Sequence, residues 1–139
     1  MDIGDAMTNK KLGNDFETAF CETLFENGYW VHNLAQNQAG QPADVLAVKN
    51  GRPFLIDCKV CTGRGFALSR LEENQDLSMG LWKWCANGEG WFAFLIGTDI
   101  YMMQYTALKA CKKHLSVLSN KDIKTWGFPL NDWLVWAQK

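Results

Sequence analysis

The sequence predicts a mixed α/β fold of the α+β type, in which a central mixed sheet is flanked by helices. Two alternating apolar runs meet at Asn50-Gly51, which is typical of a hairpin, and an unbroken apolar run at 91–97 indicates a buried strand. Apolar residues also recur at helical spacing after Asn14. At 139 residues the chain is expected to form a single domain, 1–139.

The first helix is expected to begin at Asn14 or Asp15, because either side chain can cap a helix N-terminus. Its apolar stripe continues to about Asn27, and Gly28 is the expected stop. The preceding residues, 1–12, are polar and are expected to form a flexible N-terminal arm.

The remaining elements complete the order α-β-β-β-α-β-β-α. A Ser69-x-x-Glu72 capping box is expected to open the second helix. The aromatic tail is expected to pack on the body. The elements after the first helix are a strand at 29–34, a polar loop at 35–41, a hairpin around 50–51, a loop at 62–65, a helix at 69–86, paired strands at 91–97 and 100–105, and a helix containing Leu108, Cys111, Leu115 and Leu118.

The hairpin places charged residues where an apolar face is expected. Asn50-Gly51 predicts a two-residue type I′ turn, and with that turn Asp44 lies directly opposite Asp57. The pair falls at a non-hydrogen-bonded position, where facing side chains come closest. Because side chains alternate along a strand, Lys59 shares the face of Asp57.

Two carboxylates facing each other across a ladder repel. One interpretation is structural: the register slips, or Lys59 neutralises one aspartate while the other reaches solvent. The other is functional, because a bound cation turns the repulsion into coordination. Hard divalent ions such as Mg²⁺ prefer carboxylate oxygens, and Lys59 is placed to orient a water or stabilise phosphate charge. We favour the functional interpretation.

Pro42-Ala43-Asp44 followed by Asp57-Cys58-Lys59 resembles the motif of the PD-(D/E)XK nuclease superfamily. Three flanking segments resemble RecU-type Holliday junction resolvases of phages and bacteria: "GNDFETAF", "GFALSRLEENQDLSM" and "GWFAFLIGTDIYMMQY". The resemblance covers roughly residues 13–108. This chain departs from that family by carrying Asp57 where Glu is usual, and by having only "AQNQAGQ" where a longer projecting insertion is found.

The resemblance implies a restriction-endonuclease-like αβββαβ core and a metal-dependent DNA endonuclease, most specifically a Holliday junction or branched-DNA resolvase. It implies that Mg²⁺, with Mn²⁺ able to substitute, is held by Asp44, Asp57, Glu17 and the backbone carbonyl of Cys58, and that Lys59 positions the attacking water. A homodimer follows because a four-way junction needs two symmetric cuts.

Two helical side chains are assigned through the resemblance, and each has a plain structural alternative. Glu17 shares a helix face with Phe20 and Leu24, although an exposed first-turn glutamate is the plain alternative. Gln75 matches a glutamine that the resolvases carry on the second helix, which implies a supporting or phosphate-contacting role; a hydrogen bond to backbone is its alternative.

Composition gives little further guidance about DNA binding. The formal net charge is −1, so a nucleic-acid site would depend on a local basic patch. Arg64 and Arg70 are candidates for phosphate contacts, as are Lys10 and Lys11 at the N-terminus. The competing interpretation is an ordinary connector and a solvated surface. The same two interpretations apply to three further lysines: Lys109, Lys112 and Lys113.

Cysteine usage and hydropathy bear on location. The five cysteines are odd in number and scattered, which suits reduced thiols in a cytoplasm, bacterial or of a phage-infected host cell. No apolar segment has the length of a membrane span or the form of a signal peptide. Two alternatives to a junction resolvase stay open: a nicking or restriction-like nuclease on duplex or single-stranded DNA, and a DNA-binding module of the same fold that does not cleave.

Overall fold

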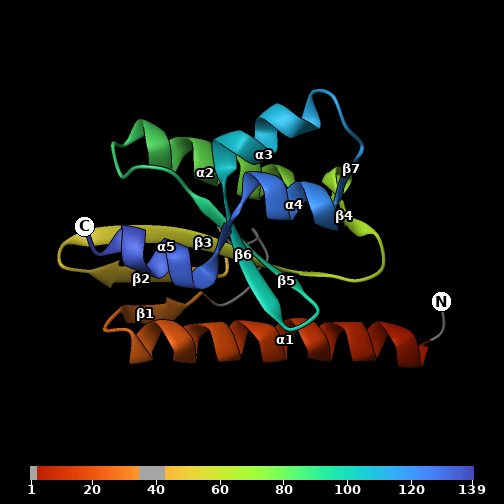
Figure 1. Cartoon of the computed structure of the whole chain (residues 1–139), viewed down its shortest axis with the longest axis horizontal. Helices are drawn as coiled ribbons and strands as arrows, with labels where there is room; N and C mark the ends of the chain where they lie inside the picture. Colours follow the sequence, from red (N-terminus) through yellow and green to blue (C-terminus); the bar gives the residue numbers. More distant parts are fainter. Residues whose placement is uncertain (1–2, 35–42) are drawn as a thin grey trace.

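A computed structural model describes residues 3–34 and 43–139, with side chains from Lys10 onward. The expected loop at 35–41 and Pro42 lie outside the described residues. The described chain forms a central six-stranded sheet with helices on both faces (Figure 1). The elements are α1 Ile3–Glu26, β1 Trp30–Asn33, β2 Val45–Lys49, β3 Arg52–Cys61, β4 Gly65–Ala67, the 3₁₀ turn η1 Leu68–Arg70, α2 Glu73–Trp84, β5 Trp91–Ile96, β6 Asp99–Gln104, α3 Tyr105–Lys112, β7 Val117–Ser119, α4 Asn120–Trp126, β8 Phe128–Pro129 and α5 Leu130–Ala137.

The sheet is mixed, which confirms the predicted fold class. Its strand order is β1-β2-β3-β5-β6-β8. The pairs β1–β2, β2–β3, β5–β6 and β6–β8 are antiparallel, whereas β3 and β5 run parallel. A parallel pair needs a crossover, and α2 supplies it between β3 and β5.

The β2–β3 hairpin has the register that the sequence predicts. Val45 pairs with Ile56, and Lys49 pairs with Arg52. Asn50 and Gly51 both have positive φ, 52° and 76°, as a type I′ turn requires. Because a slip of one residue would move every side chain to the opposite face, this register also fixes which residues of β3 enter which core layer.

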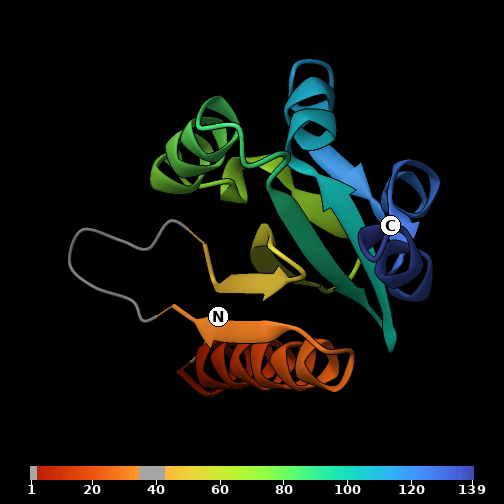
Figure 2. The same cartoon turned by 90° about the vertical axis from the view of Figure 1, so that its left-hand side faces the viewer.

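Alternating residues of β3 belong to two separate cores. Phe54 and Ile56 pack with α1 and α5 on one face, and Leu55 packs with residues of α2, α3 and α4 on the other. Figure 2 shows α1 beneath β1 and β2, with α2 and α3 on the far side of the sheet. Asp57 follows the alternation onto the second face, where α2 covers it.

Both predicted helix starts were wrong. α1 begins at Ile3 and not at Asn14 or Asp15, so residues 3–12 belong to the helix instead of forming a separate arm. Lys10, Lys11 and Leu12 are good helix formers, and a polar surface does not prevent a helix from extending into solvent.

The second start also differs, because Ser69 lies in η1. α2 begins only after Glu72, which makes no side-chain capping bond. A capping box is present instead at Ser119 and Asp122, at the start of α4.

The helical spacing that runs through Leu118 was correct only as far as Lys112. Leu118 lies in β7, where it pairs with Phe66 of β4, and both side chains are buried. Tertiary pairing with the residues after β3 therefore overrides the local helical pattern. In the aromatic tail, α5 places Trp133 in the first core, as expected, whereas Trp126 and Trp136 are exposed.

Among the described helices, none combines the length and the apolar character needed to cross a lipid bilayer.

Candidate active site

Three buried polar side chains meet at one place in the described part of the chain. Asp44 is 7% exposed, Asp57 0% and Gln75 5%, and they are the polar or charged residues found buried there. They come from the bend before β2, from β3 and from α2. Buried polar groups are expensive unless they are satisfied, and these three converge at the place where the sequence predicts a site.

Asp44 ends the ladder between β2 and β3. It lies one residue before β2, and its Oδ2 accepts a hydrogen bond of 2.8 Å from the backbone N–H of Cys58. In this register the backbone N–H and C=O of Ile56 point toward β2. Cys58 lies two residues further along β3, so its backbone N–H and C=O point toward the same edge of the strand. The Asp44 carboxylate thus replaces a backbone partner, and the Cys58 carbonyl faces the side of β3 on which Asp44 lies.

Asp57 is held by two side chains that also contact each other. Gln75 Nε2 donates to Asp57 Oδ1 at 3.0 Å, and Lys59 Nζ donates to Gln75 Oε1 at 3.3 Å. Lys59 Nζ also lies 3.0 Å from Asp57 Oδ2 as an ion pair, but Oδ2 accepts no well-aligned hydrogen bond. This oxygen is therefore buried and only partly satisfied.

The electrostatics show that the acidic groups are close enough to disfavour one another's ionised form. Burial, followed by the charge of Asp44, raises the pKa of Asp57 well above its usual value, and Lys59 opposes the shift. Burial and then Asp44 raise the pKa of Glu17 from 4.5 to about 7, again against Lys59. Glu17 thus reaches the same site from α1, and a nearby cation would stabilise all three carboxylates.

The donor set fits a hard divalent cation in part. Asp44, Asp57 and the Cys58 carbonyl offer oxygen atoms from one side, as Mg²⁺ prefers, and Asp57 Oδ2 is available to such an ion. Within residues 10–34 and 43–139, however, no three His, Cys, Asp or Glu side chains are arranged to hold a metal together. Glu17 would therefore have to turn toward the aspartates to act as a third carboxylate ligand.

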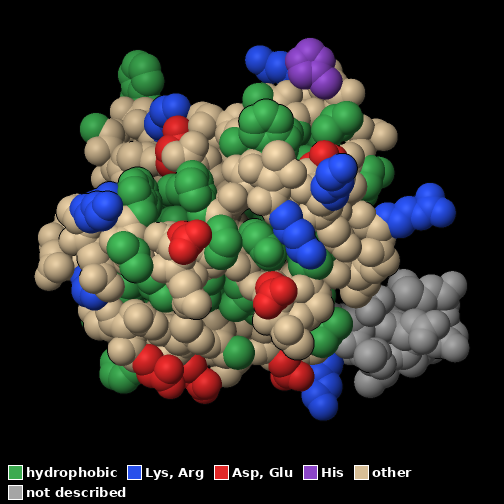
Figure 3. Space-filling model, viewed as in Figure 1, with side chains coloured by type: hydrophobic (Ala, Val, Ile, Leu, Met, Phe, Trp, Pro, Cys, Tyr) green, Lys and Arg blue, Asp and Glu red, His purple; other side chains and the backbone are tan. Residues whose placement is uncertain are grey.

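The predicted DNA-contacting residues are exposed but lie outside this cluster of contacts. Arg70 places its guanidinium over the Phe66 ring at 5.1 Å, and the Arg64 carbonyl accepts a hydrogen bond from the Asn120 N–H. Lys10 and Lys11 are exposed on α1. Figure 3 shows basic side chains scattered among acidic and hydrophobic ones on the face it presents. A DNA-backbone role for these residues stays a prediction.

One group next to the site was not found from the sequence. Asp76 follows Gln75 on α2 and binds two side chains of α3: Tyr105 donates its hydroxyl proton to Oδ1, and Lys109 Nζ lies 2.8 Å from Oδ2. This clamp, formed by Asp76, Tyr105 and Lys109, fixes α2 against α3. The two helices are separated along the chain by β5 and β6, so no local motif signals the contact.

Comparisons with known proteins agree at the level of the fold. No family model matches the chain, and no curated protein matches it. A solved structure of Hjc, a Holliday junction resolvase from the archaeal hyperthermophile Archaeoglobus fulgidus, superposes with a TM-score of 0.66 over 88% of this chain and 99% of that one. The chain shares the fold of that protein. At 13% identity the likeness confirms the expected restriction-endonuclease-like architecture, whereas the resemblance to RecU-type enzymes of phages and bacteria stays a prediction.

Proposed function

We propose that this chain is a metal-dependent DNA endonuclease that hydrolyses phosphodiester bonds in branched DNA such as Holliday junctions. In this proposal Mg²⁺ is the metal, Mn²⁺ substitutes for it, and the active form is a homodimer in the cytoplasm of a bacterium or a phage-infected host. The fold shared with an archaeal resolvase supports the class of enzyme.

The observation that carries the proposal is the burial of Asp44 beside Asp57 with Lys59 3.0 Å from the second carboxylate. A structural role explains this arrangement poorly, because paired buried acids destabilise a fold unless something compensates their charge. The single positive charge of Lys59 does not balance the negative charges of two carboxylates with Glu17 nearby. A bound divalent cation would balance them.

Each residue then has a distinct task. Asp44 and Asp57 would hold the cation together with the Cys58 carbonyl, and the bound metal would supply Lewis-acid stabilisation of charge on the scissile phosphate. Lys59 is positioned by Gln75 and would orient the attacking water or stabilise the phosphate oxygens through its Nζ. Gln75 also donates a hydrogen bond to Asp57 Oδ1 and so keeps that carboxylate oriented.

The test is cleavage of a labelled four-way junction by the full chain, with and without Mg²⁺. Asp57→Asn and Lys59→Ala should each reduce the rate by at least ~100-fold, since each removes a group proposed to act in the transition state. Matched controls change the same residue types at exposed positions: Asp99→Asn at the start of β6 and Lys121→Ala on α4. These should cleave like the wild type. Equal rates in all five proteins would refute the assigned roles.

Substrate choice is tested separately from chemistry. A panel of junction, flap, linear duplex and single-stranded DNA should show fastest cleavage of the junction, with symmetric cuts by a species of twice the monomer mass. Preferential nicking of linear duplex or single strands would replace the resolvase proposal by the nicking or restriction-like alternative.

A second candidate is a DNA-binding module of this fold that does not cleave. It is favoured by one observation, that no third acidic side chain joins Asp44 and Asp57 as a metal-holding group in the described residues. Wild-type protein that binds junctions with Mg²⁺ or Mn²⁺ present but never cuts them would establish it.

A further inference from the structure

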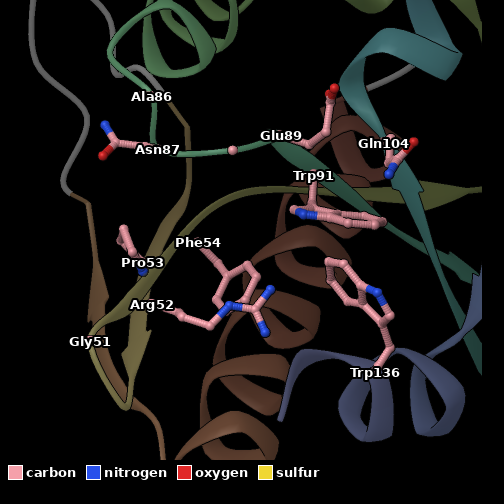
Figure 4. Close-up of a pocket in the computed structure, with 11 residues that line it drawn as sticks. Gly51, Arg52, Pro53, Phe54, Ala86, Asn87, Glu89, Trp91, Gln104 and Trp136 are labelled. Atoms are coloured by element: carbon pink, nitrogen blue, oxygen red, sulfur yellow. The ribbon is translucent and has the colours of Figure 1, made fainter. Parts of the chain in front are cut away.

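A hollow of ≈ 600 Å³ lies away from the acidic site, at the end of the sheet where β3 and β5 begin. It is bounded by the β2–β3 turn, by the loop between α2 and β5, and by α5. Figure 4 shows the side chains of Arg52, Phe54, Trp91 and Trp136 converging on it. Asn87, on the loop before β5, and Gln104, at the end of β6, also line it.

The floor is a rigid aromatic surface. Trp91 is buried, and its ring centroid lies 5.4 Å from that of Trp136, which is 44% exposed. Trp133 packs against both rings from the core at 5.8 and 6.5 Å. Trp136 is therefore held in place from beneath, with the Arg52 guanidinium 5.2 Å from its ring centroid, while 44% of the residue stays exposed to a flat ligand.

The polar groups around the floor carry little net charge. Arg52 Nη1 donates to the carbonyls of Ala137 and Lys139 at 2.9 and 3.0 Å, and its guanidinium lies 5.2 Å from the Trp136 ring. Glu89, also at the edge, is paired with Lys83 at 2.8 Å. Gln104 and Asn87 each present both a donor and an acceptor.

These features exclude several ligand classes. The single carboxylate of the lining, Glu89, is engaged and could not hold a metal ion alone. A multiply charged phosphate would face one arginine whose donors are partly used by backbone carbonyls. A purely apolar ligand would leave the amides of Gln104 and Asn87 without water. What fits is a flat, nearly neutral ring with hydrogen-bonding edges.

We propose that this hollow binds an unpaired base of the DNA substrate, stacked on Trp136 with its edge toward Gln104 and Asn87. The proposal rests on the DNA-cleaving function proposed above. Arg52 and Asp57 are five residues apart on β3, which is ~16 Å at ~3.3 Å per residue. A DNA strand that reaches both residues must therefore be at least about five nucleotides long, at ~3.4 Å per nucleotide.

The placement favours an unpaired strand over a duplex. Arg52 and Asp57 direct their side chains to opposite faces of the sheet, since an odd number of steps separates them. A strand that reaches both must pass around the end of the sheet. A stiff duplex resists such bending over a few base pairs, whereas unpaired nucleotides follow it.

The experiment measures binding of the full chain, without divalent metal, to two forked DNAs that differ only in their single-stranded arms. One arm carries bases and the other carries abasic sugars. The wild type should bind the abasic arm about fivefold to 100-fold more weakly, the range expected for losing one stacked base. Trp136→Ala should bring the ratio of the two dissociation constants, abasic arm over base-carrying arm, close to one. Trp126→Ala, which removes a tryptophan that is 62% exposed elsewhere, should leave this ratio unchanged.

A second variant guards against a folding defect in Trp136→Ala. Asn87 is exposed on the loop, so Asn87→Leu should fold normally, and its side chain should also lower the ratio by obstructing the base edge. A wild-type ratio of one, or ratios that neither variant changes, would overturn the proposal. Titration with free dAMP separates the two sources of a base: Trp136-dependent dAMP binding together with a DNA ratio of one would reassign the hollow to free nucleotides.

Failure of this proposal and failure of the nuclease proposal give different results. If the protein cleaves junctions but binds the base-carrying and abasic arms equally, the base-binding proposal is refuted and the nuclease proposal stands. If it binds the base-carrying arm more tightly but does not cleave, the nuclease proposal is refuted and base binding stands.

Discussion

Glu17→Gln should stabilise the protein at alkaline pH and have little effect in acid. The glutamate pKa is about 7 in the folded protein against 4.5 when unperturbed, because burial and Asp44 disfavour its charge. The folded state therefore holds this proton more tightly than the unfolded chain does. As pH rises from 4.5 to 7, the wild type loses stability that a neutral glutamine does not lose.

The size of the effect follows from the pKa shift. A shift of about 2.5 pH units corresponds to ~3.4 kcal/mol at 1.36 kcal/mol per unit, if it were fully expressed. Glu17 is only partly buried, and water screens its charge, so we expect ~1–2 kcal/mol at pH 8. For a chain of this length that is a rise in melting temperature on the order of 5 °C.

Urea unfolding followed by tryptophan fluorescence at pH 4, 6 and 8 measures this difference. The control is Glu22→Gln, an exposed glutamate on the same helix, whose stability should follow the wild type at each pH. A Glu17→Gln effect of the same size at pH 4 and pH 8 would refute the electrostatic reasoning, because packing does not titrate.

Adding Mg²⁺ at pH 8 extends the test to metal binding. Mg²⁺ should stabilise the wild type more than Glu17→Gln, since the ion relieves the same unfavourable charge. Equal stabilisation of both proteins would show that Glu17 is not a ligand.

Three further predictions concern the elements around the site. Gln75→Leu should destabilise by ~1–3 kcal/mol in urea unfolding, because it leaves a buried oxygen of the β3 aspartate without its donor; an unchanged midpoint would contradict this. Asp76→Asn should destabilise by ~1 kcal/mol and slow junction cleavage by loosening α2, while Lys83→Ala, which breaks an exposed ion pair on the same helix, should change stability by less than ~0.5 kcal/mol. Gly65→Ala should lower the free energy of unfolding by more than ~2 kcal/mol, since its Cβ would lie 2.2 Å from a backbone oxygen of β7. The control Gly63→Ala meets open space and should lower it by ~1 kcal/mol, because of its positive φ. Equal losses of stability in the two variants would show that the close approach at Gly65 is unimportant.

The fold class and the hairpin were predictable because their causes are local. Asn50-Gly51 sets the turn, and the turn sets the register of both strands. The α4 helix and the β4–β7 pair were not predicted. Leu118 continues a helical spacing in the sequence, but it pairs with Phe66, more than fifty residues earlier, and no local pattern reports such a contact.

The placement of the acidic site was predictable for a related reason. Asp44, Asp57 and Lys59 belong to one hairpin, so alternation and register suffice to bring them together. Glu17 and Gln75 come from separate helices, and their approach was implied by the family resemblance and not by spacing. The clamp around Asp76 had neither a local pattern nor a resemblance to indicate it.

The same register serves both the core and the acidic pair. Val45 and Ile56 enter the first core because they pair across the ladder, and one further step places Asp44 beside Asp57. A shift of one residue would separate the carboxylates, but it would also turn the apolar residues of β2 out of the core. The free energy of burying those residues therefore opposes the repulsion between the acids. The hydrophobic core holds the two carboxylates at a proximity that they would not adopt alone, so the cation that we propose would bind without a rearrangement of the strands.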